Sequence, residues 1–591
     1  MVMPIIMSIK PKRALRRIKR VCVSGAALLL MLLAPLLNAN QPAIIDYSDR
    51  FHPVVSESGM VVSQEALASR IGADILAQGG NAIDAAVATG FALAVTLPQA
   101  GNIGGGGFMM IYLAGEKRTL AVDYREMAPL AAHRDLFLGD DGGVDKNKAR
   151  YSRYSAGVPG TVAGLLHALN SYGTMSLQDV LKPAITLAEQ GVRVTRSLSF
   201  SFARAEQRLK KSPASTAYYF LTDGSPLPQG HLWKQGDLAN TLKKIASTNG
   251  EDFYQGSIAK KIVAQMKEYG GLISAEDLAA YKVVEREAVT GSYRGYEIAA
   301  MPPPSSGGVH LVQMLNILEG WDLKASGHNS ADYLHRLIES MRRAYADRSE
   351  YLGDPDFHSV PVAELTDKSY AKKLRDGIDL QRATASTSVK PGLTLPEESP
   401  QTTHFSVWDK HGNVVSNTYT LNFSYGSGIA VAGAGFLLNN EMDDFSAKLG
   451  VPNAYGLVGG TANAIEPRKR PLSSMTPVIV FKEGKPVLTT GSPGGSSIIN
   501  TVLQTILNVV DFDMNIAEAA AQPRIHHQWL PDQVFYEEDI NVDTRKRLEA
   551  MGHVLKSSSR VIGRTQTISR DERFIYGAND TRWPGGAAVG L

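Results

Sequence analysis

Apolar positions recur every three or four residues through much of the first two thirds of the chain, and they alternate with polar ones in the last third. From Gly59, the stretch GMVVSQEALASRIGADILAQGGNAIDAAVATGFALAV predicts a strand, a helix, a turn and a second helix. Residues 334–352 predict a long amphipathic helix, and 497–510 predict another. From residue 402, short alternating runs predict strands: THFSVWD, VVSNTYT, TPVIVFKEG and PVLTTGS. Without regular strand–helix alternation or an internal repeat, the pattern favours a layered α/β fold with antiparallel strands.

The first 39 residues follow a different pattern. Seven Lys and Arg residues precede the apolar run VCVSGAALLLMLLAPLL, which is short for a membrane span and contains Pro35. This arrangement is typical of a secretory signal peptide, and we expect cleavage near Ala39. A retained single-helix anchor is the alternative interpretation.

Removing this leader changes the charge and leaves no cysteine. The seven leader cations belong to 61 in the whole chain, so 54 remain against 58 acidic residues and the mature net charge is −4. No basic patch for nucleic acid is expected on that balance. The only cysteine, Cys22, lies in the leader, which excludes a disulfide, a thiol nucleophile or a cysteine metal site. At 591 residues and 44% hydrophobic content, the chain suits two domains or one large layered domain.

Two threonines stand where a segment without packing residues meets a strand. We expect residues 378–401 to be a flexible linker, and Thr402 begins the strand that follows. Hydrolysis of the Gln401–Thr402 bond would place a free α-amine beside the Thr402 hydroxyl. Such an amine has a reference pKa of about 7.7–8.0, which suits a general base. One residue would then supply both nucleophile and base; the alternative is an ordinary strand threonine.

Other polar residues suggest a pocket for the head group of an α-amino acid. An arginine after an apolar strand would bind a carboxylate, an acidic cluster would bind an ammonium group, and two adjacent serines would supply hydroxyl donors. The stretch TTGSPGG (489–495) offers amides for an oxyanion, or simply a turn before a helix. These candidates are Arg125, Glu441, Asp443, Asp444, Ser473, Ser474 and the glycines at 494–495.

Several familiar chemistries are excluded. The sequence contains no G-x-S-x-G elbow, H-E-x-x-H helix or phosphate-binding G-x-x-x-x-G-K-[ST] loop. His526 and His527 are adjacent on an extended segment and point to opposite faces, so we interpret them as packing and hydrogen-bonding histidines instead of metal ligands.

These motifs together resemble the γ-glutamyltranspeptidases, and closely the bacterial periplasmic ones. The resemblance runs from about Gly59 to about Asp580. It is carried by AIDAAVATGFAL, GNIGGGGF, VDYREMAP, GVPG, PPPSSGGVH, TTHFSVWDKHGNVVSNTYTLN, GFLLNNEMDDFS, PLSSMTPVIV, TGSPGGS and PRIHHQWLPD. It implies the four-layer αββα sandwich of the N-terminal nucleophile hydrolases.

The resemblance also implies a role for individual residues. Self-cleavage between Gln401 and Thr402 would leave a large subunit (40–401) and a small one (402–591), which form a heterodimer. Thr402 would be the nucleophile, hydrogen-bonded to Thr420, and Gly494 and Gly495 would form the oxyanion hole. The substrate α-carboxylate would be held by Arg125, Ser473 and Ser474, and the α-ammonium by Asn422, Glu441 and Asp444. No metal or organic cofactor is required.

A loop at 450–467 matches the family's lid, with Tyr455 as its gate residue, although a Gly-rich surface loop would have the same composition. A lid favours small γ-glutamyl substrates such as glutathione, with water, amino acids or dipeptides as acceptors. Two other functions remain open: a side-chain amide acylase of the same fold, which needs no ammonium site, and an exported binding protein that stays one chain.

Overall fold

The computed structural model describes residues 49–389, 402–448, 451, 459–558 and 560–591. Everything below concerns the compact unit from Phe51 to Leu591. Gln401, Tyr455 and the predicted signal peptide lie outside the described residues. None of the helices in the described ranges combines the length and apolar character that a membrane crossing requires.

Two seven-stranded sheets, drawn from distant parts of the chain, form the centre of the unit. The first has the order β19-β2-β10-β11-β3-β4-β7 and is antiparallel throughout. Its strands are β19 (Ala587–Gly590), β2 (Gly59–Ser63), β10 (Thr403–Asp409), β11 (Val414–Thr420), β3 (Gly106–Leu113), β4 (Arg118–Tyr124) and β7 (Val284–Arg286). Strand β10, which follows Thr402, is therefore near the middle of the sheet, between β2 and β11.

The second sheet has the order β1-β18-β17-β13-β12-β9-β8. Its strands are β1 (Val54–Ser56), β18 (Ile575–Asn579), β17 (Gln566–Arg570), β13 (Lys485–Thr490), β12 (Val478–Lys482), β9 (Tyr296–Ala300) and β8 (Val289–Tyr293). Two small sheets lie outside this pair, β14-β15-β16 (Ile525–His526, Val534–Tyr536, Leu555–Ser557) and β5-β6 (Val192–Arg193, Leu232–Trp233).

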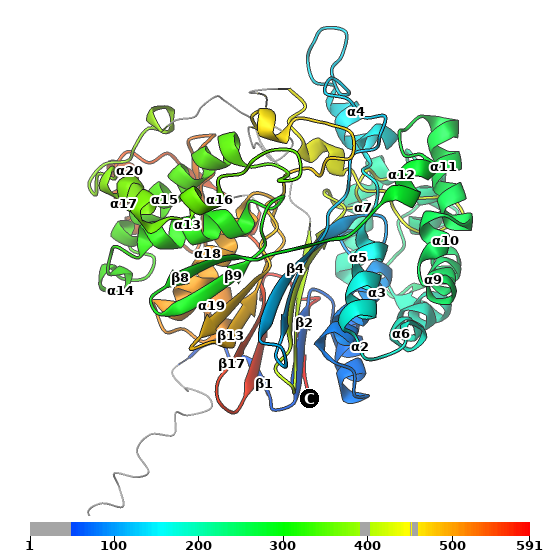
Figure 1. The fold of residues 1–591 in the computed structure, drawn as a ribbon, viewed down its shortest axis with the longest axis horizontal. Coiled ribbons are helices and arrows are strands. Elements are labelled where there is room, and N and C mark those ends of the chain that lie inside the picture. Colours follow the sequence, from blue (N-terminus) through cyan, green and yellow to red (C-terminus); the bar gives the residue numbers. More distant parts are fainter. Residues whose placement is uncertain (1–48, 390–401, 449–450, 452–458, 559) are drawn as a thin grey trace, which may run out of the picture. The chain divides into compact units, whose positions relative to one another are not determined.

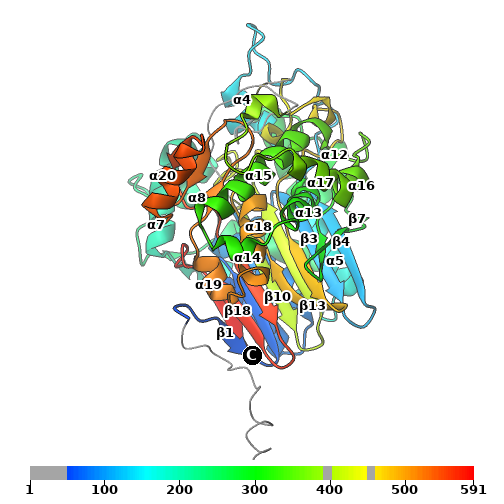
Figure 2. The same ribbon diagram turned by 90° about the vertical axis from the view of Figure 1, so that its left-hand side faces the viewer.

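Alternating side chains make the two sheets stack between helical layers. On β2, Val61 packs in one core with the helices that lie between residues 66 and 280. Met60 and Val62 pack in a second core, which contains residues of both sheets. This alternation follows from the two-residue period of a strand. Helices lie on the outer side of each sheet (Figures 1 and 2), so the expected four-layer αββα architecture is confirmed.

The helices divide between the two outer layers. On the side of the first sheet lie α2 (Ala66–Ala77), α3 (Ala82–Thr96), α5 (Thr161–Tyr172), α6 (Leu177–Gln190), α7 (Arg196–Leu209), α8 (Pro213–Tyr219), α9 (Gly236–Thr248), α10 (Glu251–Tyr254), α11 (Ser257–Tyr269) and α12 (Ala275–Ala280). On the side of the second lie α13 (Gly307–Leu318), α14 (Leu323–Ser326), α15 (Ala331–Tyr351), α16 (Val362–Leu365), α17 (Lys368–Asp376), α18 (Ser497–Val510), α19 (Ile516–Ala521) and α20 (Val542–Ala550). Helix α4 (Lys146–Tyr151) lies beyond the ends of the strands.

Residues 379–389 differ from the flexible linker that the composition predicts. The Ala383 amide donates to the Met551 carbonyl (2.8 Å), and the Ser386 amide donates to Asp532 (2.7 Å). The Trp529 indole donates to the carbonyls of Ser386 and Val389. Because these partners satisfy the backbone of a segment that has few apolar side chains, the segment docks without a hydrophobic core of its own.

Candidate active site

Thr402 lies at the end of the central strand pair of the first sheet. Thr403 pairs with Tyr419 across β10 and β11, which places Thr402 opposite Thr420. The two hydroxyl oxygens are 3.4 Å apart, and Thr402 is 5% exposed. The glycine run before β3 is required here, because a Cβ at Gly105 would lie 1.9 Å from the Thr420 carbonyl oxygen. The Asn422 amide donates to the Thr420 hydroxyl at 2.9 Å.

Arg125, directly after β4, is fully buried and faces carboxyl groups of the protein itself. Its Nη2 lies 2.6 Å from Asp444, and its Nη1 donates to Glu441. Its Nε donates to the Pro471 carbonyl at 3.2 Å. A third carboxyl, Glu126, lies 3.6 Å from Nη1. The predicted carboxylate-binding arginine, directly after β4, is therefore in direct contact with two predicted ammonium-binding acids on the short 3₁₀ turn Glu441–Asp444.

Burial and pairing shift the pKa values of this cluster in opposite directions. Burial lowers the pKa of Arg125, but the nearby carboxyls outweigh it and raise that pKa above its ordinary value. Burial raises the pKa of Glu441 and Asp444, against the attraction of Arg125. Burial also raises the pKa of Glu126 to about 7. Burial therefore disfavours the charged form of all three acids, and Arg125 opposes this effect.

The paired serines bring a second arginine to the site. Ser473 and Ser474 line the same pocket as Thr402. The Ser474 hydroxyl accepts a hydrogen bond from Nη2 of Arg348 (3.2 Å). Nε of Arg348 donates to the Ser306 hydroxyl (2.9 Å). Sequence reasoning missed Arg348 because it is one of several basic residues on helix α15, and nothing in the helical pattern distinguishes it.

The glycine pair lies between two cavities. Gly495 lines the pocket of Thr402, whereas Gly494 lines a larger cavity on the other side of the turn. Gly495 has φ 57° and Gly494 has φ 149°, values that favour glycine. Within the described residues, neither amide donates a hydrogen bond. An amide in this state is available to an oxyanion.

One pocket thus collects most of the predicted residues. It is lined by Arg125, Arg348, Thr402, Thr420, Asn422, Glu441, Asp444, Leu472, Ser473, Ser474, Met475, Gly495, Ser496 and Ile498. Asp443 does not line it and instead pairs with Arg150 at 3.2 Å. Leu472 and Met475 supply apolar walls beside the charged groups.

The histidines have hydrogen-bond partners of their own. His526 bonds to Asn500 and Gln528, and His527 to Asp532, as the sequence interpretation expects. Among the described residues, His335, Glu339 and His553 form a group whose ligand atoms lie within 4.8 Å of one another. His335 bonds to His553 (2.7 Å) and to the Asp379 carbonyl. Glu339 accepts hydrogen bonds from Arg343 and from the Thr384 amide. We therefore interpret this group as holding the docked segment 379–389, and not as a metal site.

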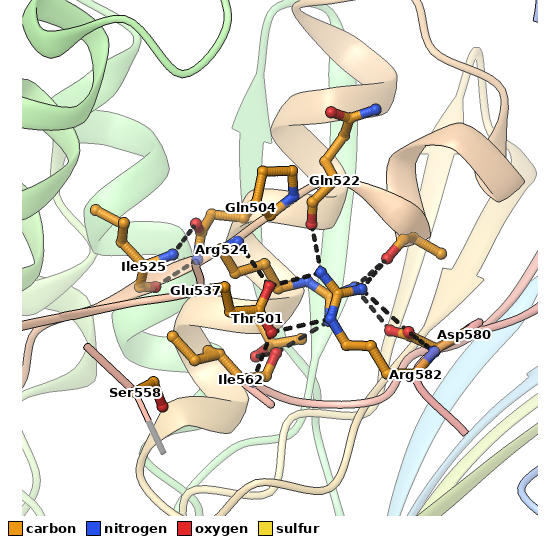
Figure 3. Close-up of polar contacts among 12 residues, drawn as sticks. Thr501, Gln504, Gln522, Arg524, Ile525, Glu537, Ser558, Ile562, Asp580 and Arg582 are labelled. Atoms are coloured by element: carbon orange, nitrogen blue, oxygen red, sulfur yellow. Dashed lines mark hydrogen bonds and ion pairs between the residues drawn. The ribbon is translucent and has the colours of Figure 1, made fainter. Parts of the chain in front are cut away.

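A buried polar network holds the loop that packs against Gly494 (Figure 3). Arg524 donates to Asp580 (2.8 Å) and to the Ile562 carbonyl (2.9 Å). Arg582 pairs with Glu537 (2.6 Å) and with Asp580 (3.1 Å). The network holds the loop between β16 and β17, and each of its buried carboxylates forms an ion pair with an arginine.

Comparisons with known proteins identify the family of the chain. The model of the family described as gamma-glutamyltranspeptidase matches residues 68–590. A "Glutathione hydrolase proenzyme" of Escherichia coli is 52% identical over 535 residues, which cover 90% of this chain and 92% of that protein. Among solved structures, a cephalosporin acylase from Bacillus halodurans has a TM-score of 0.82 at 29% identity and covers 93% of this chain and 99% of its own. A gamma-glutamyltranspeptidase from Helicobacter pylori has a TM-score of 0.54 at 48% identity and covers 55% of this chain and 93% of its own. The chain belongs to the gamma-glutamyltranspeptidase family.

Proposed function

We propose that this chain is a self-processing γ-glutamyl transferase and hydrolase that cleaves the γ-glutamyl amide of glutathione and related compounds. The observation that carries the proposal is the pocket itself. Thr402 and Thr420 lie at one end of a pocket that also holds Arg125 with Glu441 and Asp444. A hydroxyl nucleophile beside separate sites for a carboxylate and an ammonium suits a γ-linked glutamyl group, whose reacting carbonyl is remote from its charged end.

The pairing of charges supports a zwitterionic head group. A carboxylate would take hydrogen bonds from Arg125, Ser473 and Ser474, and an ammonium would donate to Asp444, Glu441 or the Asn422 side-chain oxygen. The head group carries one charge of each sign, so its carboxylate can pair with Arg125 and its ammonium with the acids that now contact Arg125. The net charge of the buried cluster then stays the same on binding, which avoids burial of an unpaired charge.

The chemistry follows from the placement of Thr402. Its Oγ attacks the γ-amide carbon while its α-amine takes the proton, and the Gly494 and Gly495 amides stabilise the oxyanion. The α-amine then gives the proton to the leaving amine, and cysteinylglycine departs from glutathione. The γ-glutamyl ester on Thr402 passes to water or to the neutral amine of an amino acid or dipeptide. No cofactor takes part in these steps.

Processing and export complete the proposal. The chain would lose residues 1–39 on export to the periplasm, and cleavage at Gln401–Thr402 would give subunits 40–401 and 402–591. The docked segment 379–389 supports this, because its partners Trp529, Asp532 and Met551 all belong to the proposed small subunit. The large subunit would stay attached near its new end after cleavage.

The test is intact mass and N-terminal sequencing of the purified wild type beside Thr402→Ala. We expect two chains in the wild type, one beginning TTHFSV, and hydrolysis of a chromogenic γ-glutamyl anilide. Thr402→Ala should stay a single chain and lose activity by at least about a thousandfold. A wild-type chain that stays uncut, or a variant that still turns over, would refute the proposal.

A side-chain amide acylase is the second candidate, favoured by the similarity to the cephalosporin acylase structure. A glutaryl amide has no α-ammonium and makes no use of Asp444. Asp444→Ala should therefore lower kcat/KM for a γ-glutamyl anilide by about a hundredfold or more, and far less for a glutaryl anilide. Equal, small losses on both substrates would favour the acylase.

A further inference from the structure

A basic cavity lies on the far side of the glycine turn from Thr402. Its empty volume is about 1880 Å³, part of it at the open mouth, and Gly494 forms part of its wall. It is lined by five cations and, among the described residues, by no Asp or Glu. The cations are Arg204, Arg208, Lys211, Arg560 and Arg564. A concave surface with charges of one sign concentrates ligands of the opposite sign.

Among the described residues, Arg208 and Arg564 form no ion pairs like those of Arg125. The Nε atoms of Arg208 and Arg564 are buried and have no hydrogen-bond partner among the described residues. Arg208 does donate through Nη2 to the Ser424 carbonyl, and the Arg564 guanidinium lies 4.5 Å from the ring centroid of Trp583. Burial lowers the pKa of both arginines, and for Arg564 it outweighs the attraction of Asp580. Because both side chains line the cavity, an anion bound there would lie beside two guanidinium groups that form no ion pair among the described residues.

Both walls of the cavity are held in place. Arg204 and Arg208 are on helix α7, one turn apart, and Lys211 comes two residues after its end. The loop that carries Arg564 is fixed by the network of Figure 3, in which Arg524 binds the Ile562 carbonyl and Asp580 accepts from the Thr565 amide (3.1 Å). The Arg564 amide also donates to Ser492 at 2.8 Å, on the segment that leads to Gly494. Arg204 and Arg208 therefore lie on a helix, and Arg564 lies on a hydrogen-bonded loop that contacts the segment before Gly494.

The lining indicates the chemistry of the ligand. Guanidinium forks pair with carboxylate or phosphate oxygens. Tyr151, Phe200 and Trp583 add aromatic surface between the cations, and an organic ligand gains more from that surface than a bare inorganic ion does. Peptides and amino acids, which carry carboxylates, are substrates and products of the reaction proposed above, and the choice of carboxylate over phosphate rests on that proposal.

We propose that the basic cavity is a second binding site, for a short acidic peptide that is held through its carboxylates. The site is distinct from the head-group pocket, because it needs an anion with no accompanying cation. A ligand bound there lies against Gly494, one of the two glycines whose amides are proposed to stabilise the oxyanion.

The test is calorimetric titration of the processed protein with N-acetyl-triglutamate at low salt. This probe has no γ-glutamyl amide and no free amine, so it is neither a substrate nor a fit for the head-group pocket. We expect binding that weakens as salt rises and that is absent for N-acetyl-triglutamine. Arg204→Gln combined with Lys211→Gln should weaken binding by about tenfold, because both cations are exposed and neither has an ion pair among the described residues.

The matched control is Arg70→Gln combined with Lys260→Gln, which makes the same charge change at exposed helix positions outside the cavity. It should leave triglutamate affinity unchanged. No binding by the wild type, equal losses in both double variants, or binding of triglutamine as tight as that of triglutamate would overturn the proposal. Binding of inorganic tripolyphosphate without triglutamate would overturn the assignment to peptide carboxylates. Hydrolysis of the γ-glutamyl anilide, measured on the same samples, reports on the proposed function separately.

Discussion

The buried arginines of the two cavities beside the glycine turn differ in their ionic partners and in the direction of their pKa shifts. In the Thr402 pocket, Arg125 contacts Glu441 and Asp444, and Glu126 lies 3.6 Å away. In the basic cavity, Arg208 and Arg564 have buried Nε atoms without partners among the described residues. The pKa of Arg125 is raised and the pKa values of Arg208 and Arg564 are lowered.

This difference shows which ligand each cavity can take. The Thr402 pocket is already neutralised, so a zwitterion can replace its ion pairs without a change of net charge. The basic cavity is lined by cations and, among the described residues, by no acidic side chain, so its charge favours an anion. Adjacent sites in one protein can therefore discriminate between peptides by net charge as well as by shape.

The largest effect is expected for Arg125→Lys, which tests the ion pairs of the Thr402 pocket. A lysine keeps the charge but loses the planar fork that reaches Glu441 and Asp444 together, so the buried acids lose most of their compensation. We expect kcat/KM for a γ-glutamyl anilide to fall by about a thousandfold, which corresponds to about 4 kcal/mol. Steady-state kinetics of the processed variant measure the effect.

The control for this prediction is Arg286→Lys, which also loses a fork. Arg286 pairs with Asp123 (2.8 Å) and Asp356 (2.7 Å) and does not line the Thr402 pocket. Its replacement should leave kcat/KM within about threefold of the wild type. Equal losses in the two variants would mean that Arg125 acts through the fold and not through the pocket.

A smaller effect is expected at the wall of the basic cavity. Asp580 is fully buried and accepts hydrogen bonds from Arg524, Arg582 and the Thr565 amide. Asp580→Asn removes the negative charge that Arg524 and Arg582 share. The free energy of unfolding in urea should therefore fall by about 3 kcal/mol. The exposed pair Lys324–Asp513 provides the control, because Asp513→Asn should cost less than about 1 kcal/mol. Similar losses at both positions would show that the network of Figure 3 does not stiffen the loop.

Much of the fold could be predicted from apolar periodicity. The helix expected over 497–510 is α18 (Ser497–Val510), and the strands expected after residue 402 are β10, β11, β12 and β13. The order of strands in the sheets could not be predicted, because it depends on pairings such as β2 with β10, which are more than 300 residues apart. The docking of 379–389 was also missed, since its partners are side chains on distant elements and its own composition is typical of a linker.

The candidate site was predicted from motifs, and its electrostatics were not. Motifs identified Arg125, Thr402 and Asp444, which the structure places in one pocket. They did not indicate that Arg125 contacts the acids in the absence of substrate, because contact depends on how β4 meets the turn at Glu441. The basic cavity was missed for a related reason: Arg204 and Arg564 are 360 residues apart in sequence, and the mature chain is slightly acidic overall.

The smallest predicted effect concerns Glu126, the third acid beside Arg125. Both of its carboxyl oxygens are buried and accept no hydrogen bond from the described residues, and burial raises its pKa to about 7 from an ordinary 4.5. Between these two pH values the folded protein binds more protons than the unfolded chain, so stability falls as pH rises from 4.5 to 7. Glu126→Gln removes this titration. Urea unfolding of both proteins should show the variant gaining about 2 kcal/mol relative to the wild type across that window, whereas a constant difference would mean that Glu126 stays ionised beside Arg125.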